Sequence, residues 1–240
     1  MNESNVAIVV PAAGSGTRMG GRRKQFRTLG GAPVLVRTLE IFEHHPAVDA
    51  LVVVGPPGEA KALQADLQGY GLTKLHAVAE GGTTRQESVE RGLFVLPEET
   101  DLVLVHDAVR PFLPADRLSA VIDVARTHGA AALAVPVADT VRRSETEAGA
   151  SVFGETVPRD GLWRMQTPQA FRTGWLRDAH AAARADGVTG TDEVELVQRF
   201  GHAVRLVEGR ALTFKITTPA DWSLAEALWP VWSGGLKMED

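Results

Sequence analysis

The sequence predicts an α/β fold, an open and mostly parallel twisted sheet with helices on both faces. Short runs of apolar, often β-branched residues alternate along the chain with segments whose apolar residues recur every three or four positions. Strands that alternate with helices are joined by right-handed crossovers and pair in parallel. The chain has 240 residues and is 44% hydrophobic, which suits one domain with a sizeable core. We therefore expect a single domain over residues 1–240.

The expected elements follow in order along the chain. Strands are expected at residues 6–10, 50–54, 75–79, 102–106, 130–137, 203–207 and 213–216. Helices are expected at residues 32–42, 59–68, 85–96, 118–125 and 175–186, with two more that begin near 191 and 218. Thr218 suits the N-cap of the last helix, Pro219 its first position and Asp221 its third.

Residues 139–159 break this alternation. The segment is polar and has little periodicity, and a loop of this length is unusual inside a compact domain. We expect a projecting β-hairpin or arm instead. Because arms commonly clasp a partner subunit, we also expect a homodimer that is held through this arm.

Composition excludes several classes of function. A formal net charge of −5 gives no general attraction to nucleic acids or anionic membranes, so we expect neither as a partner. The chain has no cysteine, which excludes disulfides, thiolate metal sites and a cysteine nucleophile. The amino terminus lacks a basic leader region, and no apolar run is long enough to span a bilayer. We expect a soluble, cytoplasmic protein.

The first strand runs into a small-residue turn that suits a phosphate group. Gly14 and Gly16 can adopt positive φ and leave backbone N–H groups uncovered, at the carboxyl end of a central strand where such sheets bind ligands. Four cations follow, namely Arg18, Arg22, Arg23 and Lys24. We interpret this stretch as a grip for a nucleoside triphosphate. The alternative is a solvated basic loop after an edge strand.

Two common glycine-rich loops do not fit this stretch. The Walker loop requires Lys-Ser or Lys-Thr directly after its last glycine, whereas Arg18 and Met19 stand here. The dinucleotide-binding fingerprint requires a third glycine at the position of Met19. Ser15 and Ser88 also lack the Gly-x-Ser-x-Gly setting of a serine nucleophile, so we expect no covalent intermediate.

Two further strand ends carry groups that suit the same ligand. The strand at 75–79 leads to Gly81, Gly82 and Arg85, and the strand at 102–106 leads to Asp107 and Arg110. In an open parallel sheet these carboxyl ends meet at one edge. The resulting site would combine glycine turns, several cations and one carboxylate. That combination suits nucleotidyl or phosphoryl transfer, in which positioning and charge neutralisation dominate.

Each of these residues also has a purely structural interpretation, and the sequence leaves both open. Asp107 would then cap a turn or a helix, Arg110 would pair with a surface acid, and His106 would be a hydrogen-bonded core residue. The dipole of the helix near residue 191 accounts most economically for three acidic residues at its start, Asp192, Glu193 and Glu195.

Taken together, the motifs resemble those of a known family. The first set, Pro11-Ala12-Ala13-Gly14-Ser15-Gly16-Thr17-Arg18-Met19 with Lys24-Gln25-Phe26, is similar to the signature of sugar-nucleotide pyrophosphorylases and cytidylyltransferases. The rest are Gly81-Gly82 with Arg85 and Ser88, His106-Asp107-Ala108-Val109-Arg110-Pro111-Phe112, Asp139-Thr140, Gly161-Leu162-Trp163, Gln166-Thr167-Pro168-Gln169, Thr191-Asp192-Glu193 and Lys215-Ile216-Thr217. Nearly the whole chain thereby resembles the 2-C-methyl-D-erythritol 4-phosphate cytidylyltransferases of the non-mevalonate isoprenoid pathway. The resemblance implies a Rossmann-like fold of the nucleotide-diphospho-sugar transferase type.

The resemblance also implies a reaction and a site. CTP would donate a cytidylyl group to 2-C-methyl-D-erythritol 4-phosphate and release pyrophosphate, with Mg²⁺ or another divalent cation bound. Arg18 and Lys24 would be catalytic, because they neutralise charge that grows on the triphosphate. The residues implied to bind the nucleotide are Pro11, Ala12, Ala13, Gly14, Ser15, Gly16, Gly82, Arg85, Ser88 and Ala108. Those implied to position the substrate are Asp107, Arg110, Thr140, Arg159, Thr191 and Lys215, with Asp107 on either the substrate hydroxyls or the metal.

In the family the arm crosses a dimer interface, so Thr140 and Arg159 would serve the site of the neighbouring subunit. Relatives often carry proline before the Lys-Gln pair, where this chain has Arg23, but the following Gln25 keeps Lys24 in register. Two other functions stay open. One is a cytidylyltransferase for ribitol 5-phosphate or another polyol phosphate, and the other is a non-catalytic nucleotide-binding protein on the same fold.

Overall fold

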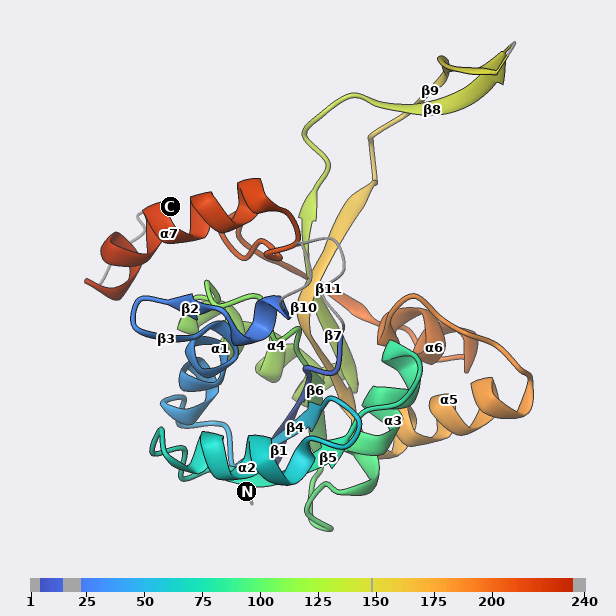
Figure 1. The fold of residues 1–240 in the computed structure, drawn as a ribbon. Helices are drawn as coiled ribbons and strands as arrows, with labels where there is room; N and C mark the ends of the chain where they lie inside the picture. Colours follow the sequence, from blue (N-terminus) through green and yellow to red (C-terminus); the bar gives the residue numbers. More distant parts are fainter. Residues whose placement is uncertain (1–4, 15–22, 148, 235–240) are drawn as a thin grey trace.

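The computed structural model describes residues 5–14, 23–147 and 149–234. Its centre is a seven-stranded sheet in the order β11-β7-β10-β6-β1-β4-β5 (Figure 1). The strands are β1 (Val6–Pro11), β4 (Ala50–Gly55), β5 (Leu75–Glu80), β6 (Leu102–Val105), β7 (Ala130–Pro136), β10 (Trp163–Arg172) and β11 (Arg205–Glu208). All neighbouring pairs are parallel except those of β10, which runs antiparallel to β6 and β7. The predicted α/β fold with a mostly parallel sheet is confirmed.

Helices cover both faces of this sheet (Figure 1). On one face lie α1 (Val34–Glu43), α2 (Ala60–Gln68) and α4 (Ala115–His128), and on the other α3 (Arg85–Phe94), α5 (Thr173–Ala185) and α6 (Glu193–Arg199). The alternation of side chains along β1 explains the two layers, because Ile8 and Val10 pack into one core cluster and Ala7 and Val9 into the other. Both sets are fully buried, as expected for a central parallel strand.

A third cluster forms around the last helix, α7 (Pro219–Ser233). Its predicted start is confirmed, since Thr218 and Asp221 form a reciprocal capping box. The prediction of a strand at 213–216 is wrong. This segment is irregular: Ile216 N–H donates to Val109 O at 3.0 Å, and Phe214 stacks on Phe112 with ring centroids 5.4 Å apart. Its apolar residues serve packing against the loop after β6 rather than a strand ladder.

No strand was predicted in residues 161–171, yet β10 occupies the middle of the sheet between β6 and β7. The stretch is polar and contains Pro168, which disfavours a central strand. A register shift between Met165 and Gln169 accommodates this proline. Two short strands that were also not predicted, β2 (Thr28–Leu29) and β3 (Ala32–Pro33), form a separate hairpin.

The segment predicted as an arm contains an antiparallel hairpin of β8 (Val141–Glu147) and β9 (Ala150–Val157). It projects far from the sheet (Figure 1). Most of its residues are exposed, and it pairs only with itself among the described strands. Within the described ranges, no helix has the length and apolar character needed to cross a lipid bilayer.

Candidate active site

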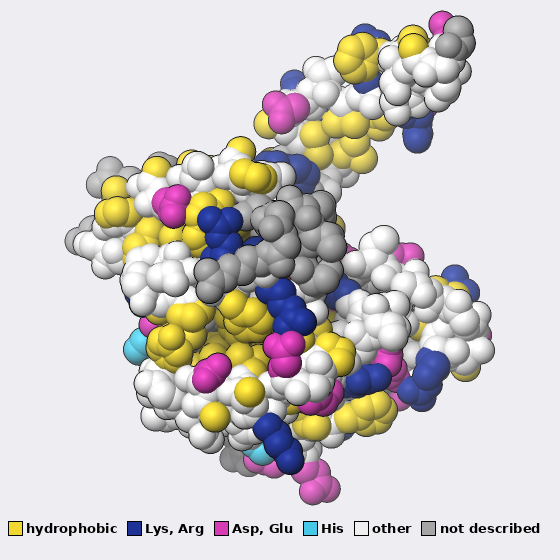
Figure 2. Space-filling view, in the orientation of Figure 1, with side chains coloured by type: hydrophobic (Ala, Val, Ile, Leu, Met, Phe, Trp, Pro, Cys, Tyr) yellow, Lys and Arg dark blue, Asp and Glu magenta, His cyan; other side chains and the backbone are white. Residues whose placement is uncertain are grey.

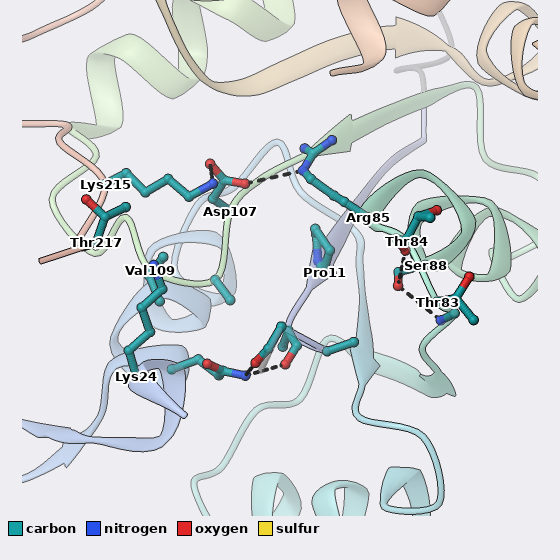
Figure 3. A pocket seen from close by; sticks show the side chains of 16 residues that line it. Pro11, Lys24, Thr83, Thr84, Arg85, Ser88, Asp107, Val109, Lys215 and Thr217 are labelled. Carbon is teal, nitrogen blue, oxygen red and sulfur yellow. Dashed lines mark hydrogen bonds and ion pairs between the residues drawn. The ribbon is translucent and has the colours of Figure 1, made fainter. Parts of the chain in front are cut away.

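A cavity of about 450 Å³ lies where the carboxyl ends of β1, β5 and β6 meet (Figure 3). The structure brings many of the predicted residues together in its wall: Pro11, Ala12, Ala13, Gly14, Lys24, Gly82, Arg85, Ser88, Asp107, Ala108 and Lys215. Ser15, Gly16 and Arg18 lie outside the described residues. Five lining residues had no predicted role: Gln25, Thr83, Thr84, Val109 and Thr217.

Gln25 shapes the first glycine turn. It is 3% exposed and lies in the 3₁₀ turn η2 (Lys24–Phe26), from which its Nε2 donates to Ala12 O at 2.7 Å and to Gly14 O at 2.8 Å. Because one amide clamps the start of the loop, the turn that carries Lys24 is fixed beside it. The Lys-Gln-Phe motif is the signal for this role in the sequence, although from sequence it indicated only the register of Lys24.

The structure separates the roles of the two adjacent cations. Arg23 Nη1 donates to both carboxylate oxygens of Glu59 at 2.7 Å, whereas Lys24 lines the cavity. Arg23 therefore pairs at the surface and does not line the cavity. This arrangement agrees with the register in which Lys24 is the candidate catalytic residue.

The second glycine turn passes very close to the first. A Cβ at Gly81 would lie 2.4 Å from Ala13 Cβ and 2.7 Å from Gly55 O, so only glycine allows this approach. Gly82 N–H donates to Ser88 Oγ at 3.1 Å, which ties the turn to α3. Thr84 caps the amino end of α3, which therefore faces the cavity. Backbone donors and the positive end of the helix dipole suit an anionic ligand there.

Asp107 is the only carboxylate among the described residues that line the cavity, and it is 7% exposed. Its Oδ2 lies 3.0 Å from Lys215 Nζ and 3.1 Å from Arg110 Nε, and its Oδ1 lies 3.6 Å from Arg85 Nε. Burial by itself would raise the pKa of Asp107, but Lys215, Arg110 and Arg85 hold it far below its ordinary value. Asp107 is therefore ionised and anchors three cations at the cavity.

His106 has the structural role that was the alternative to a ligand role. It is fully buried, and burial lowers its pKa to about 4, so the ring is neutral. Nε2–H donates to Arg110 O at 3.1 Å, since a carbonyl can only accept. Nδ1 is then the acceptor for the Thr167 hydroxyl at 3.2 Å, and the same hydroxyl oxygen accepts Asp107 N–H at 3.1 Å. The chain of hydrogen bonds fixes the backbone that carries Asp107 and Arg110.

Four predicted substrate-positioning residues do not line the cavity of their own chain. Thr140 and Arg159 lie at the base of the arm, where Arg159 Nη1 donates to Ala138 O. Thr191 precedes α6 and donates through Oγ1 to Glu195 Oε2 at 2.9 Å. Arg110 also lies outside the wall, but it reaches the site through Asp107.

The described residues do not fit a metal ion held by protein ligands. They contain no group of three or more His, Asp or Glu side chains placed to hold one. Both oxygens of Asp107 already face cations. A Mg²⁺ ion bound by one or two carboxylates takes its remaining ligands from water and substrate phosphates.

Comparison with known proteins identifies the family. The sequence profile of IspD, 2-C-methyl-D-erythritol 4-phosphate cytidylyltransferase, matches residues 6–230. The chain is 52% identical over 227 residues to the 2-C-methyl-D-erythritol 4-phosphate cytidylyltransferase of Salinibacter ruber, covering 95% of this chain and 94% of that protein. The structure of the cytidylyltransferase of the same name from Thermus thermophilus superposes with a TM-score of 0.77 at 38% identity, covering 95% of this chain and 100% of that chain. A 4-diphosphocytidyl-2C-methyl-D-erythritol synthase from Anaerococcus prevotii gives a TM-score of 0.80 at 28% identity, with 94% and 96% covered. The resemblance seen in the motifs is thus confirmed, and the chain belongs to the 2-C-methyl-D-erythritol 4-phosphate cytidylyltransferase family.

Proposed function

We propose that this chain transfers a cytidylyl group from CTP to 2-C-methyl-D-erythritol 4-phosphate, giving 4-diphosphocytidyl-2-C-methyl-D-erythritol and pyrophosphate. Membership of the family supports the reaction. The observation that carries it is the cavity itself, in which two close glycine turns and the cations Lys24, Arg85 and Lys215 surround one space (Figure 3). Such a wall suits a highly anionic nucleotide.

The two glycine turns would hold the cytidine. Ala12, Ala13, Gly14 and Gly82 present little side chain, so backbone groups can reach the base and ribose. Ser88 adds a hydroxyl beside Gly82, to which it is already hydrogen-bonded. The amino end of α3 faces the same space and favours negative charge there.

In the transfer step, a phosphate oxygen of the acceptor attacks the α-phosphorus of CTP. A new P–O bond forms while the bond to the β-phosphate breaks, and its electron pair leaves with pyrophosphate. Lys24 would stabilise the charge that grows on the leaving group, which is where positioned cations act in phosphoryl transfer. Arg18 would act with it by motif, although it lies outside the described residues.

The acceptor would bind on the Lys215 side of the cavity. Asp107 orients the Lys215 ammonium at 3.0 Å and leaves its other N–H groups for a phosphate. Asp107 is also a candidate for the acceptor hydroxyls. Mg²⁺ or another divalent cation would arrive on the triphosphate of CTP, whose oxygens supply ligands that the described residues lack.

The arm would complete the site across a homodimer. Thr140 and Arg159 lie at its base and do not line the cavity of their own chain. Apolar side chains gather along the projecting arm (Figure 2), and Phe153 within it is 84% exposed. Exposed apolar surface on a projecting hairpin favours a partner subunit that covers it. Arg159 of one subunit would then grip the acceptor phosphate bound to the other, and Thr191 is a weaker candidate for acceptor contact.

Pyrophosphate release tests the reaction. The purified protein is incubated with CTP, Mg²⁺ and either 2-C-methyl-D-erythritol 4-phosphate or ribitol 5-phosphate. We expect release with the methylerythritol phosphate. Faster release with ribitol 5-phosphate would move the assignment to a polyol-phosphate cytidylyltransferase. No release with any acceptor, although CTP binds, would indicate a non-catalytic nucleotide-binding protein.

Mixed dimers test the shared site. Lys24→Ala and Arg159→Ala subunits, each inactive by itself, are unfolded together and refolded as a mixture. One of the two sites in each mixed dimer is intact if Arg159 acts across the interface. We expect recovery of about a quarter of the wild-type activity, because random pairing makes about half of the dimers mixed. Demonstrated mixed dimers without activity would contradict the shared site.

A further inference from the structure

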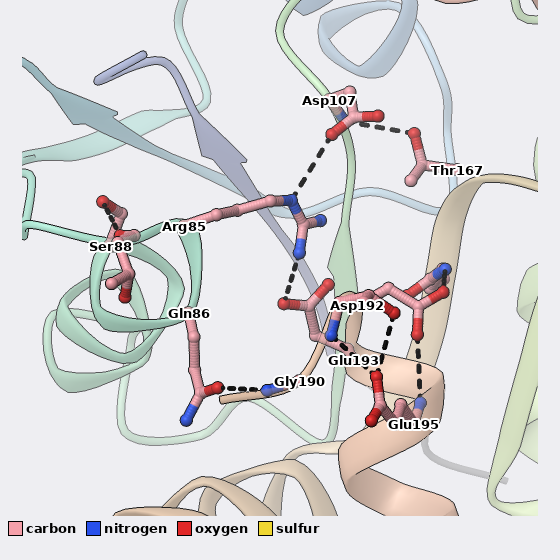
Figure 4. Close-up of polar contacts among 12 residues, drawn as sticks. Arg85, Gln86, Ser88, Asp107, Thr167, Gly190, Asp192, Glu193 and Glu195 are labelled. Atoms are coloured by element: carbon pink, nitrogen blue, oxygen red, sulfur yellow. Dashed lines mark hydrogen bonds and ion pairs between the residues drawn. The ribbon is translucent and has the colours of Figure 1, made fainter. Parts of the chain in front are cut away.

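An ion pair joins Arg85 in the wall of the cavity to a carboxylate buried beneath it. Arg85, the first residue of α3, directs Nη1 to Glu193 Oε1 at 2.8 Å, and its Nε lies 3.6 Å from Asp107 Oδ1 (Figure 4). Glu193 is the first residue of α6 and is 1% exposed. One guanidinium thus stands between two carboxylates, one inside the cavity wall and one beneath it.

The burial of Glu193 is costly and has no purely local explanation. Burial raises the pKa of this carboxyl, and the nearby carboxylates of Asp192 and Asp107 add to this effect, while Arg85 opposes it. Its Oε2 has no hydrogen-bond partner within the described part of the chain. Asp192 already places a negative charge at the amino end of α6, where its Oδ1 accepts the Glu195 N–H at 3.0 Å as the N-cap. A second carboxylate is not needed for the helix dipole. Arg85 is therefore the group that offsets the desolvation of Glu193.

The three cations around Asp107 lie at different distances from it. The separation of 3.6 Å between Arg85 Nε and Asp107 Oδ1 is too long for a good hydrogen bond, whereas Lys215 and Arg110 contact Asp107 at 3.0 and 3.1 Å. A guanidinium without a second anion would close on Asp107 as a bidentate pair. It would then compete with Lys215 for the same carboxylate and no longer be directed at a nucleotide in the cavity.

We propose that Glu193 is a positioning residue of the active site, which holds Arg85 toward the bound nucleotide and leaves Asp107 to Lys215. This inference rests on the proposed function and extends it to a residue outside the cavity wall. Glu193 does not line the cavity. It acts by keeping the Arg85 guanidinium paired with Glu193, so that Arg85 does not pair fully with Asp107.

Glu193→Gln tests the proposal, because it removes the charge and keeps the shape of the side chain. We expect CTP to bind about 10-fold more weakly in titration calorimetry without acceptor, since Arg85 then pairs with Asp107 instead of the nucleotide. We expect kcat/KM to fall roughly 10- to 100-fold, the size of effect that a displaced binding group produces. Glu90→Gln is the matched control. Glu90 pairs with Arg184 between α3 and α5, away from the cavity, so its loss should leave CTP affinity and kinetics unchanged.

A double-mutant cycle separates positioning from stability. If Glu193 acts through Arg85, the variant with both Arg85→Gln and Glu193→Gln loses no more CTP affinity than Arg85→Gln by itself. This double variant leaves no unpaired buried charge, which keeps the test open if a single variant folds poorly. Additive losses would overturn the proposal, and so would a Glu193→Gln variant whose melting temperature falls while its CTP affinity stays at the wild-type value. A wild-type protein that binds CTP but releases no pyrophosphate would count against the proposed function only, because calorimetry still tests Glu193.

Discussion

His180 lies on α5 with 1% of its surface exposed, and neither ring nitrogen has a hydrogen-bond partner among the described residues. Burial lowers its pKa from 6.5 to about 4, and the charges of Arg85 and Arg184 contribute in the same direction. The folded protein therefore keeps this ring neutral, while the unfolded chain protonates it below about pH 6.5. Because the unfolded state binds more protons between these two pKa values, the free energy of unfolding should fall as the pH is lowered.

The size of the effect follows from the two pKa values. One histidine that shifts from 6.5 to about 4 costs about 2 kcal/mol of stability between pH 7 and pH 5. His106 has the same shift and should add a similar loss. Glu193 has the opposite effect on the free energy of unfolding. Its pKa is raised in the folded protein, so the folded state binds this proton at a higher pH than the unfolded chain does. Asp107 adds a loss only below about pH 4, where the unfolded chain begins to protonate that carboxyl.

His180→Leu isolates one of these contributions. Urea unfolding of the wild type and the variant is measured at pH 7 and at pH 5, at one protein concentration. We expect the loss of stability between the two pH values to be smaller by about 2 kcal/mol in the variant. Leu176→Met is the control, because this buried α5 residue carries no titratable group and should shift both measurements equally. Parallel pH profiles in the wild type and His180→Leu would refute the reasoning.

Two further substitutions test the cavity wall. Lys24→Ala should lower kcat by roughly 10²–10³ in the pyrophosphate assay at saturating CTP, the usual loss for one transition-state donor; an unchanged kcat would contradict its role. Gly81→Ala should raise the KM for CTP by about 10-fold, because the new Cβ would lie 2.7 Å from Gly55 O and displace the turn. Gly174→Ala is its control, since a Cβ there meets nothing within 4 Å, and equal KM values in the two variants would contradict the close approach.

The strand ends at the cavity could be predicted from the sequence. The apolar runs of β1 and β6 are continuous in the chain, β5 is a weaker run that contains His76, and the cavity groups follow directly after each strand. Parallel strands place such ends along one edge. This is why the sequence alone led us to expect Gly14, Gly82 and Asp107 around a single ligand.

The position of β10 was not visible in the sequence. Its polar stretch with Pro168 resembles a loop, and its strand character comes from pairing with β6 and β7, which lie far earlier in the chain. Pairing between distant segments leaves no local periodicity to detect. The same holds for Thr167, whose hydroxyl reaches His106 and Asp107 only because β10 passes beside β6.

The adjacent acids Asp192 and Glu193 differ in what determines their roles: the local sequence for Asp192 and the tertiary structure for Glu193. The sequence placed both at a helix start, and this determines the role of Asp192, because an N-cap needs only backbone groups three residues away. It does not determine the role of Glu193, which depends on the direction from which α6 meets α3 and on the reach of Arg85. A helix cap depends on residues that are neighbours in the chain, so the sequence determines it. The partner of a buried charge depends on how separate elements pack, so only the tertiary structure determines it.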